Sequence, residues 1–102
     1  MARVAFKMQL KPGNDVEYKR RHDEIWPELA ELIRDTGISN YSIWRDDLTL
    51  FGYLEVEDPL KMAALPQLPL MQKWWAHMEP LMECNPDNSP LVTPLHEAFY
   101  LA

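Results

Sequence analysis

The segment YKRRHDEIWPEL, residues 18–29, carries the helical pattern around which the rest of the chain is organised. Residues three, four and seven positions apart share one face of a helix. That spacing forms a single stripe, which consists of Tyr18, His22, Ile25, Leu29 and Leu32. The lower half of the stripe is ordinary core material, whereas the upper half places a phenol and an imidazole one turn apart. These two side chains are either satisfied core residues or the floor of a pocket, and the segment alone leaves both readings open.

Pro27 interrupts a helical pattern that starts near Asn14 and runs to Asp35. A proline inside a helix removes a hydrogen bond and clashes with the preceding turn, which costs roughly 3 kcal/mol. The sequence therefore predicts either a kink just before Pro27 or a second helix with Pro27 in its first turn. Gly37 follows as the expected left-handed cap.

The remaining elements follow from the spacing of apolar residues. Residues 4–10 alternate between apolar and polar, which predicts a half-buried strand. Further strands are expected over 38–45, 48–57 and 95–101, with helices over 59–65 and 68–82. In the second strand, alternation places Tyr41 and Ile43 on one face and Ile38 on the other. The order predicts an α+β fold of the ferredoxin-like βαββαβ type, in which helices cover one face of an antiparallel sheet. A second subunit, pairing sheet to sheet, is the expected cover for the open face.

Length and composition place the chain among small globular proteins. Its 102 residues predict a single domain over 1–102, and 47% apolar with 25% charged residues fits that class. The net charge of −6 argues against nucleic acid as a partner, and the basic run 19–21 is expected on the solvated side of its helix. One cysteine, Cys84, favours a reducing compartment, and the N-terminal segment is too short and polar for a signal peptide or a membrane span. A cytoplasmic protein without a membrane partner is the expectation.

The chain lacks the common catalytic signatures. It contains no glycine-rich phosphate loop, no GxSxG, no HExxH and no metal-spaced cluster. What remains is His22 with Tyr18 and Tyr41, the adjacent pair Trp74 and Trp75, and a polar loop at 85–90 that is either a structural turn or a lid. This set supports proton transfer and stacking against a small ligand. Because the two tryptophans are adjacent, at least one of them must leave the core.

Several motifs resemble the L-rhamnose mutarotase family. They are RRHxxIWPEL within the opening segment, Trp74-Trp75, NPDNSP at 85–90 and EAFYL at 97–101. The resemblance runs nearly end to end. It implies a cytoplasmic, homodimeric α/β-barrel enzyme that interconverts the α and β anomers of L-rhamnopyranose with no cofactor and no metal. By match of motif, His22 takes the proton-donor position, and the sugar contacts fall on Tyr18, Tyr41, Trp74 and Trp75.

The residues agree with what that reaction needs. Mutarotation opens the sugar ring by protonating the ring oxygen while the anomeric hydroxyl loses its proton, and closure on the other face reverses this. A histidine with a pKa near neutrality can give and take such a proton. The second proton acceptor stays open between a tyrosine, Asp87 and water. Two other classes also stay open: a sugar-binding or regulatory module without turnover, and another cofactor-free enzyme on the same scaffold.

Overall fold

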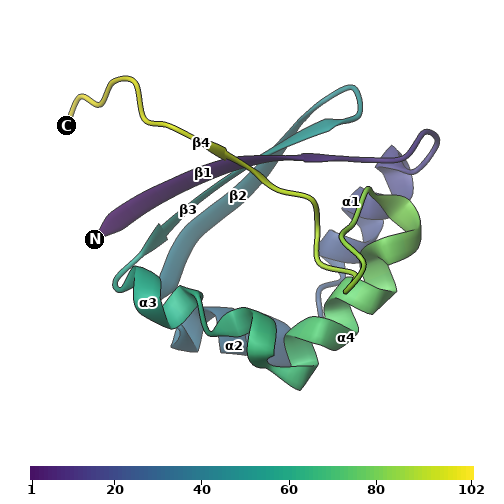
Figure 1. Ribbon diagram of the computed structural model, residues 1–102, viewed down its shortest axis with the longest axis horizontal. Coiled ribbons are helices and arrows are strands. Elements are labelled where there is room, and N and C mark those ends of the chain that lie inside the picture. Colours follow the sequence, from purple (N-terminus) through teal and green to yellow (C-terminus); the bar gives the residue numbers. More distant parts are fainter.

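The computed structural model describes residues 1–102 and consists of a four-stranded antiparallel sheet with helices on one side (Figure 1). The strand order is β2-β3-β1-β4, and the strands are β1 (Ala2–Gln9), β2 (Ile38–Asp46), β3 (Thr49–Val56) and β4 (Thr93–Leu95). The helices are α1 (Asp15–Asp23), α2 (Pro27–Asp35), α3 (Pro59–Met62) and α4 (Pro69–Met78). This order confirms the predicted ferredoxin-like α+β fold.

The helix break predicted at Pro27 is complete. Helix α1 ends at Asp23, and Pro27 is the first residue of α2, where its missing N–H needs no partner within the helix. The alternative of a second helix is therefore confirmed over that of a kink. Gly37 follows α2 with φ of +87°, and its N–H donates to the carbonyl of Arg34 at 2.9 Å, as expected of a left-handed cap.

Prolines also shorten the helices of the second half. The predicted helix over 59–65 is α3, which ends at Met62 and is followed by a 3-10 turn at Leu65–Gln67. The predicted helix over 68–82 is α4, followed by a second 3-10 turn at Glu79–Leu81 that contains Pro80. Each turn contains a proline. Because proline has no N–H to donate, the α-helical hydrogen-bond ladder cannot continue through it.

A β-bulge in β2 changes the faces that strict alternation predicts. The register of β2 against β3 shifts by one residue around Asn40 and Tyr41, and Asn40 has φ of +50°. An extra residue in one strand moves every later side chain to the opposite face. The prediction that Ile38 and Ile43 lie on different faces is therefore wrong, since both face the helices. Tyr41 remains on the side of Ile43, as predicted.

The last strand lies earlier in the chain and is shorter than predicted. Strand β4 pairs with Ala5–Lys7 of β1, and the residues after Leu95 form no strand, so the predicted strand over 95–101 is wrong. The Glu97 side chain still reaches Arg3 in an ion pair of 2.7 Å. Beyond it the chain runs past the edge of the sheet (Figure 1). The alternation of side chains at 97, 99 and 101 is the same in a paired strand and in an extended segment without a partner, so the pattern could not tell these two apart.

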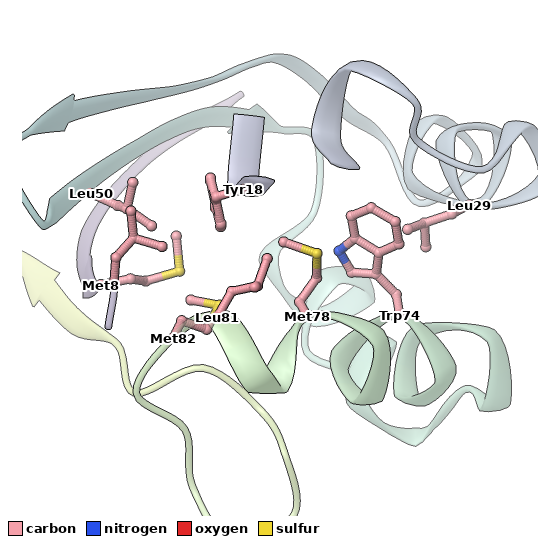
Figure 2. Packing of buried hydrophobic residues seen from close by; sticks show 9 residues of the cluster. Met8, Tyr18, Leu29, Leu50, Trp74, Met78, Leu81 and Met82 are labelled. Atoms are coloured by element: carbon pink, nitrogen blue, oxygen red, sulfur yellow. The ribbon is translucent and has the colours of Figure 1, made fainter. Parts of the chain in front are cut away.

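The core lies between the sheet and the helices. Leu10, Leu29, Leu50 and Val56 are the largest side chains that solvent does not reach. Figure 2 shows how the sheet, α1, α2, α4 and the turn after α4 each contribute to the main cluster; its labelled members are Met8, Tyr18, Leu29, Leu50, Trp74, Met78, Leu81 and Met82. Burying one such aliphatic side chain contributes about 1.5–3 kcal/mol. This cluster holds α1 and α4 in place beneath the sheet. None of the helices is long and apolar enough to span a lipid bilayer.

Candidate active site

A cavity of about 960 Å³ lies between the helices and the inward face of the sheet. All five side chains that the sequence singled out line it, and they are Tyr18, His22, Tyr41, Trp74 and Trp75. They come from α1, from the bulge of β2 and from α4, which are far apart in the sequence. The tertiary structure therefore assembles the predicted set at one place.

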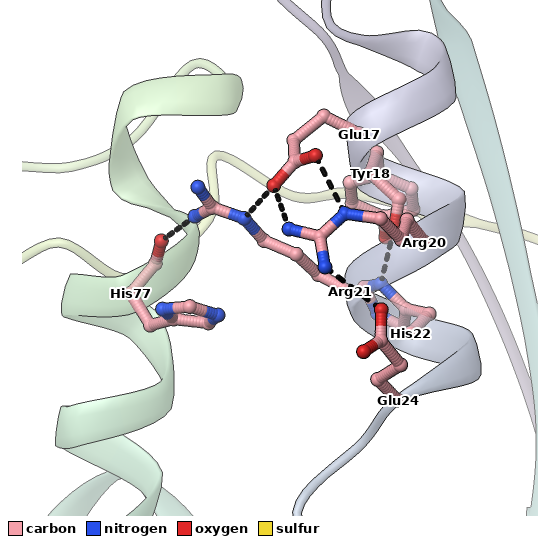
Figure 3. Close-up of polar contacts among 7 residues, drawn as sticks. All are labelled: Glu17, Tyr18, Arg20, Arg21, His22, Glu24 and His77. Atoms are coloured by element: carbon pink, nitrogen blue, oxygen red, sulfur yellow. Dashed lines mark hydrogen bonds and ion pairs between the residues drawn. The ribbon is translucent and has the colours of Figure 1, made fainter.

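Tyr18 and His22 lie one turn apart on α1 with their rings nearly stacked. The ring centroids are 4.3 Å apart and the planes meet at 31°. Nδ1 of His22 lies 3.1 Å from the backbone carbonyl of Tyr18 (Figure 3). Because a carbonyl oxygen only accepts, Nδ1 must carry a proton and donate it to this bond. Nε2 is then the nitrogen that exchanges protons with a ligand, as an acceptor in neutral imidazole and as a donor in imidazolium.

Burial sets the resting protonation of these groups. It lowers the pKa of His22 below the ordinary 6.5, although the hydrogen bond to Tyr18 acts in the opposite direction. Burial also raises the pKa of Tyr18, and the nearby Tyr41 phenol adds to this. Tyr41 is 42% exposed, yet the protein around it disfavours its phenolate and raises its pKa to about 12. At neutral pH the cavity thus holds one neutral imidazole, which is a base, and two phenol hydroxyls, which are donors.

The two tryptophans of α4 take different positions. Trp74 is buried, and its ring meets that of His22 edge-on at 5.4 Å. Trp26 also packs edge-on against Trp74, with ring centroids 5.1 Å apart, and does not itself line the cavity. Trp75 is half-buried and lines the cavity from the neighbouring face of the helix. The expectation that one of the adjacent tryptophans leaves the core is therefore confirmed.

Arg21 connects the helix of His22 to the helix of Trp74. Its Nε donates to Glu17 at 2.6 Å, and its Nη1 donates to the backbone carbonyl of His77 in the last turn of α4 (Figure 3). Hydrogen bonds from Arg20 and from Arg21 to its carboxylate hold the pKa of Glu17 at about 2. The basic run was predicted to lie on the solvated side of its helix. Arg21 departs from that prediction, because its guanidinium reaches across to α4 and is only 21% exposed.

The loop at 85–90 is a closed turn. The Asn85 N–H donates to the carbonyl of Ser89 at 2.7 Å, and the Ser89 N–H donates to the carboxylate of Asp87 at 3.0 Å. Pro90 lines the cavity, whereas Asp87 is exposed and its carboxylate is engaged within the turn. This placement favours the structural role for the loop and leaves Asp87 without a route to a ligand in the cavity.

Apart from Tyr41, the sequence did not single out residues on the sheet side of the cavity. Phe6 lines it, and the ring meets that of Tyr41 edge-on, with centroids 6.4 Å apart and planes at 70°. Ile43 lies beside them on β2. Alternation placed Phe6 on the inward face of its strand. Only the pairing of β1 with β3, and of β3 with β2, brings it next to Tyr41.

The model of the L-rhamnose mutarotase family matches residues 3–101. The chain belongs to this family. L-rhamnose mutarotases of Brucella anthropi and Listeria monocytogenes are 52% and 50% identical to it. The first alignment covers 97% of this chain and 95% of the relative, and the second covers both chains in full. The crystal structure of L-rhamnose mutarotase from Formosa agariphila superposes with a TM-score of 0.93 over the whole of both chains at 43% identity. Membership of the L-rhamnose mutarotase family thus confirms the resemblance seen in the motifs.

Proposed function

We propose that this protein is an L-rhamnose mutarotase, an isomerase that interconverts the α and β anomers of L-rhamnopyranose by acid–base ring opening and closure. The observation that carries the proposal is the bond from Nδ1 of His22 to the carbonyl of Tyr18. It ties one ring nitrogen to the helix and leaves Nε2 for a ligand in a cavity walled by tyrosine and tryptophan. Family membership supports the same reading.

In the proposed mechanism, Nε2 of neutral His22 takes the proton of the anomeric hydroxyl. The bond between the anomeric carbon and the ring oxygen breaks, and the ring oxygen receives a proton from a tyrosine hydroxyl or from water. The open-chain aldehyde then turns about its first carbon–carbon bond. On closure, the ring hydroxyl returns its proton and attacks the aldehyde carbon, while imidazolium gives the Nε2 proton to the new anomeric oxygen. His22 is therefore the base of one half-reaction and the proton donor of the other.

Magnetisation transfer between the two anomeric proton signals of L-rhamnose tests the proposal directly. Added protein is expected to speed this exchange in proportion to its concentration. A non-catalytic sugar-binding module would shift or broaden the signals without changing the exchange rate. If the exchange rate stays at its value in buffer, the protein does not catalyse mutarotation of L-rhamnose and the proposal is contradicted.

We expect the acid limb of the pH profile to lie below pH 6.5. His22 has a pKa lowered by burial, so it stays neutral as the pH falls through the ordinary value and becomes imidazolium only below it. Nε2 then has no lone pair with which to take the anomeric proton. The measurement is kcat/KM for anomer exchange as a function of pH, with NMR titration of the His22 ring in parallel. An acid limb at or above the ordinary histidine pKa would contradict this assignment.

Tyr18→Phe and Tyr41→Phe are each expected to weaken sugar binding. Raised pKa values keep both hydroxyls protonated at neutral pH, so each can donate one hydrogen bond to a sugar oxygen. Losing one such neutral bond costs about 0.5–1.5 kcal/mol, which corresponds to roughly a 2–12-fold loss in kcat/KM. Tyr53→Phe is the matched control, because that hydroxyl donates to Glu55 at 2.9 Å. If all three variants behave alike, the cavity hydroxyls do not contact the sugar.

We also propose that the protein is a homodimer, paired through the outer face of the sheet. Trp44, Phe51, Tyr53 and Leu95 all lie on this face, because cross-strand partners share a face and the neighbouring residues of β3 point inward. Trp44 is 70% exposed, and Phe99 and Leu101 of the terminal tail are each 80% exposed. A second copy of the chain is the occupant that covers this apolar surface without an additional partner.

The dimer proposal predicts the sedimentation behaviour. At micromolar concentration the protein is expected to sediment with twice the chain mass of 12.0 kDa. Trp44→Glu places a charge within the proposed contact and is expected to shift the equilibrium to monomer. Leu60→Glu, on α3 and away from the sheet, is the control for added charge. A clean monomer mass for the unmodified chain would contradict the proposal.

Two further proposals concern the extent of the domain and the location of the protein. We propose that residues 1–102 act as one domain, since the cavity draws on elements from both halves of the chain. We propose a cytoplasmic location, because Cys84 is a free thiol and the chain has no second cysteine for an internal disulfide.

A further inference from the structure

Gly52 lies in the middle of β3, between Phe6 of β1 and Ile43 of β2. A Cβ atom placed on Gly52 would stand 2.3 Å from Cζ of Phe6 and 2.5 Å from its Cε2. Such distances are far inside van der Waals contact. The Phe6 ring therefore occupies the space that any side chain at position 52 would need.

The backbone does not require a glycine at this position. Gly13 and Gly37 have positive φ, whereas Gly52 belongs to a regular strand and has an extended conformation that any residue adopts. Glycine inside a strand is destabilising relative to alanine. Where the backbone gives no reason for it, glycine in a strand often marks a close approach by another group. Here that group is the Phe6 ring.

The position of the Phe6 ring matters to the cavity. The ring lines the cavity on its sheet side and meets Tyr41 edge-on. Leu50 and Leu54 occupy the same face of β3 on either side of Gly52 and are buried. A ring displaced from Gly52 would therefore have room only toward the helices, which is into the cavity.

We propose that Gly52 and Phe6 act as a pair that sets the depth of the cavity and thereby selects the substituent the sugar carries on that side. This inference rests on the proposed function, because it takes L-rhamnose as the ligand. The Phe6 ring is apolar and cannot hydrogen-bond a hydroxymethyl group, but it packs well against a methyl group. The pair is thus a specificity determinant that favours the 6-deoxy sugar, and neither residue takes part in proton transfer.

Gly52→Ala tests the inference through the Michaelis constant. The displaced ring would fill part of the cavity, so KM for L-rhamnose is expected to rise by about fivefold or more, which corresponds to about 1 kcal/mol of lost binding, while kcat changes less. L-Lyxose, the same pyranose without the methyl group, is expected to be affected less than L-rhamnose. The double variant Phe6→Leu with Gly52→Ala removes the clash and is expected to restore KM.

Gly13→Ala is the matched control. It also adds a methyl group to a glycine, at a site with φ of +83° and nothing within 4 Å of the new Cβ. It is expected to lower the melting temperature through backbone strain and to leave KM unchanged. The control separates lost stability from a changed cavity.

Phe6→Leu alone provides an independent test if Gly52→Ala does not fold. A smaller side chain deepens the cavity, so the variant is expected to use L-mannose, which carries a hydroxyl on the methyl carbon, better relative to L-rhamnose. The inference would be overturned if folded Gly52→Ala had an unchanged KM, or if the double variant did not restore a raised KM. An unchanged sugar preference in Phe6→Leu would overturn it as well. Absence of L-rhamnose exchange in the unmodified protein would instead contradict the proposed function.

Discussion

His22→Ala is expected to reduce kcat for anomer exchange by about 10²–10⁴-fold, the range typical of a lost general acid–base group. The reason is geometric. Nδ1 is held by the Tyr18 carbonyl, so Nε2 is the one position from which the imidazole can exchange a proton with the sugar. The expected change in KM is small by comparison, because the tyrosine and tryptophan contacts remain. The measurement is the exchange rate at saturating L-rhamnose, with circular dichroism to show that the fold is intact.

His77→Ala is the control for this prediction. The His77 ring also packs beside Trp74, at 5.6 Å, but it is exposed and does not line the cavity. Its backbone carbonyl, which accepts from Arg21, is retained in the variant. The control is expected to keep nearly full activity. Full activity in His22→Ala would rule out the proposed mechanism, and an equal loss in both variants would assign the effect to the packing around Trp74.

Leu29→Ala is expected to have the largest effect on stability. Leu29 is completely buried and belongs to the cluster that contains Tyr18 and Trp74. Truncating such a leucine costs about 2–5 kcal/mol, through lost burial and the void that remains. The total stability of a typical domain is about 5–15 kcal/mol. Chemical denaturation of the variant at a fixed protein concentration measures this difference.

Leu60→Ala is the matched comparison. Leu60 is 80% exposed on α3, so the same substitution removes no packed side chain. Its stability is expected to change by less than about 0.5 kcal/mol. Similar losses at both positions would mean that the core between α2 and α4 contributes less than its burial indicates.

Local pattern alone was enough for several features of the fold. The one-turn spacing of Tyr18 and His22 is a property of neighbouring residues, as is the inability of Pro27 to continue a helix. Both therefore appear in the structure as predicted. The motifs that resemble the L-rhamnose mutarotases are likewise contiguous strings, and the family model confirms them.

The features that the sequence did not reveal depend on pairing between distant segments. The bulge at Asn40 exists only as a register between β2 and β3, and the shortness of β4 depends on where β1 can pair with it. Arg21 reads as an ordinary surface arginine until α4 is placed beside α1. None of these leaves a trace in the period of apolar residues, because that period reports only the geometry of one element.

The pair of Tyr18 and His22 on α1 shows what the sequence determines and what it leaves to the tertiary structure. Its sequence determined which chemical groups are present and that a phenol and an imidazole stand one turn apart. It could not decide whether they face a core or a cavity. The tertiary structure decided this, by placing Tyr41 from the bulge of β2 and Trp75 from α4 around the same space. The physical reason is that helical spacing fixes direction within one element, whereas a cavity is formed by the distances between elements, which depend on side-chain packing throughout the core.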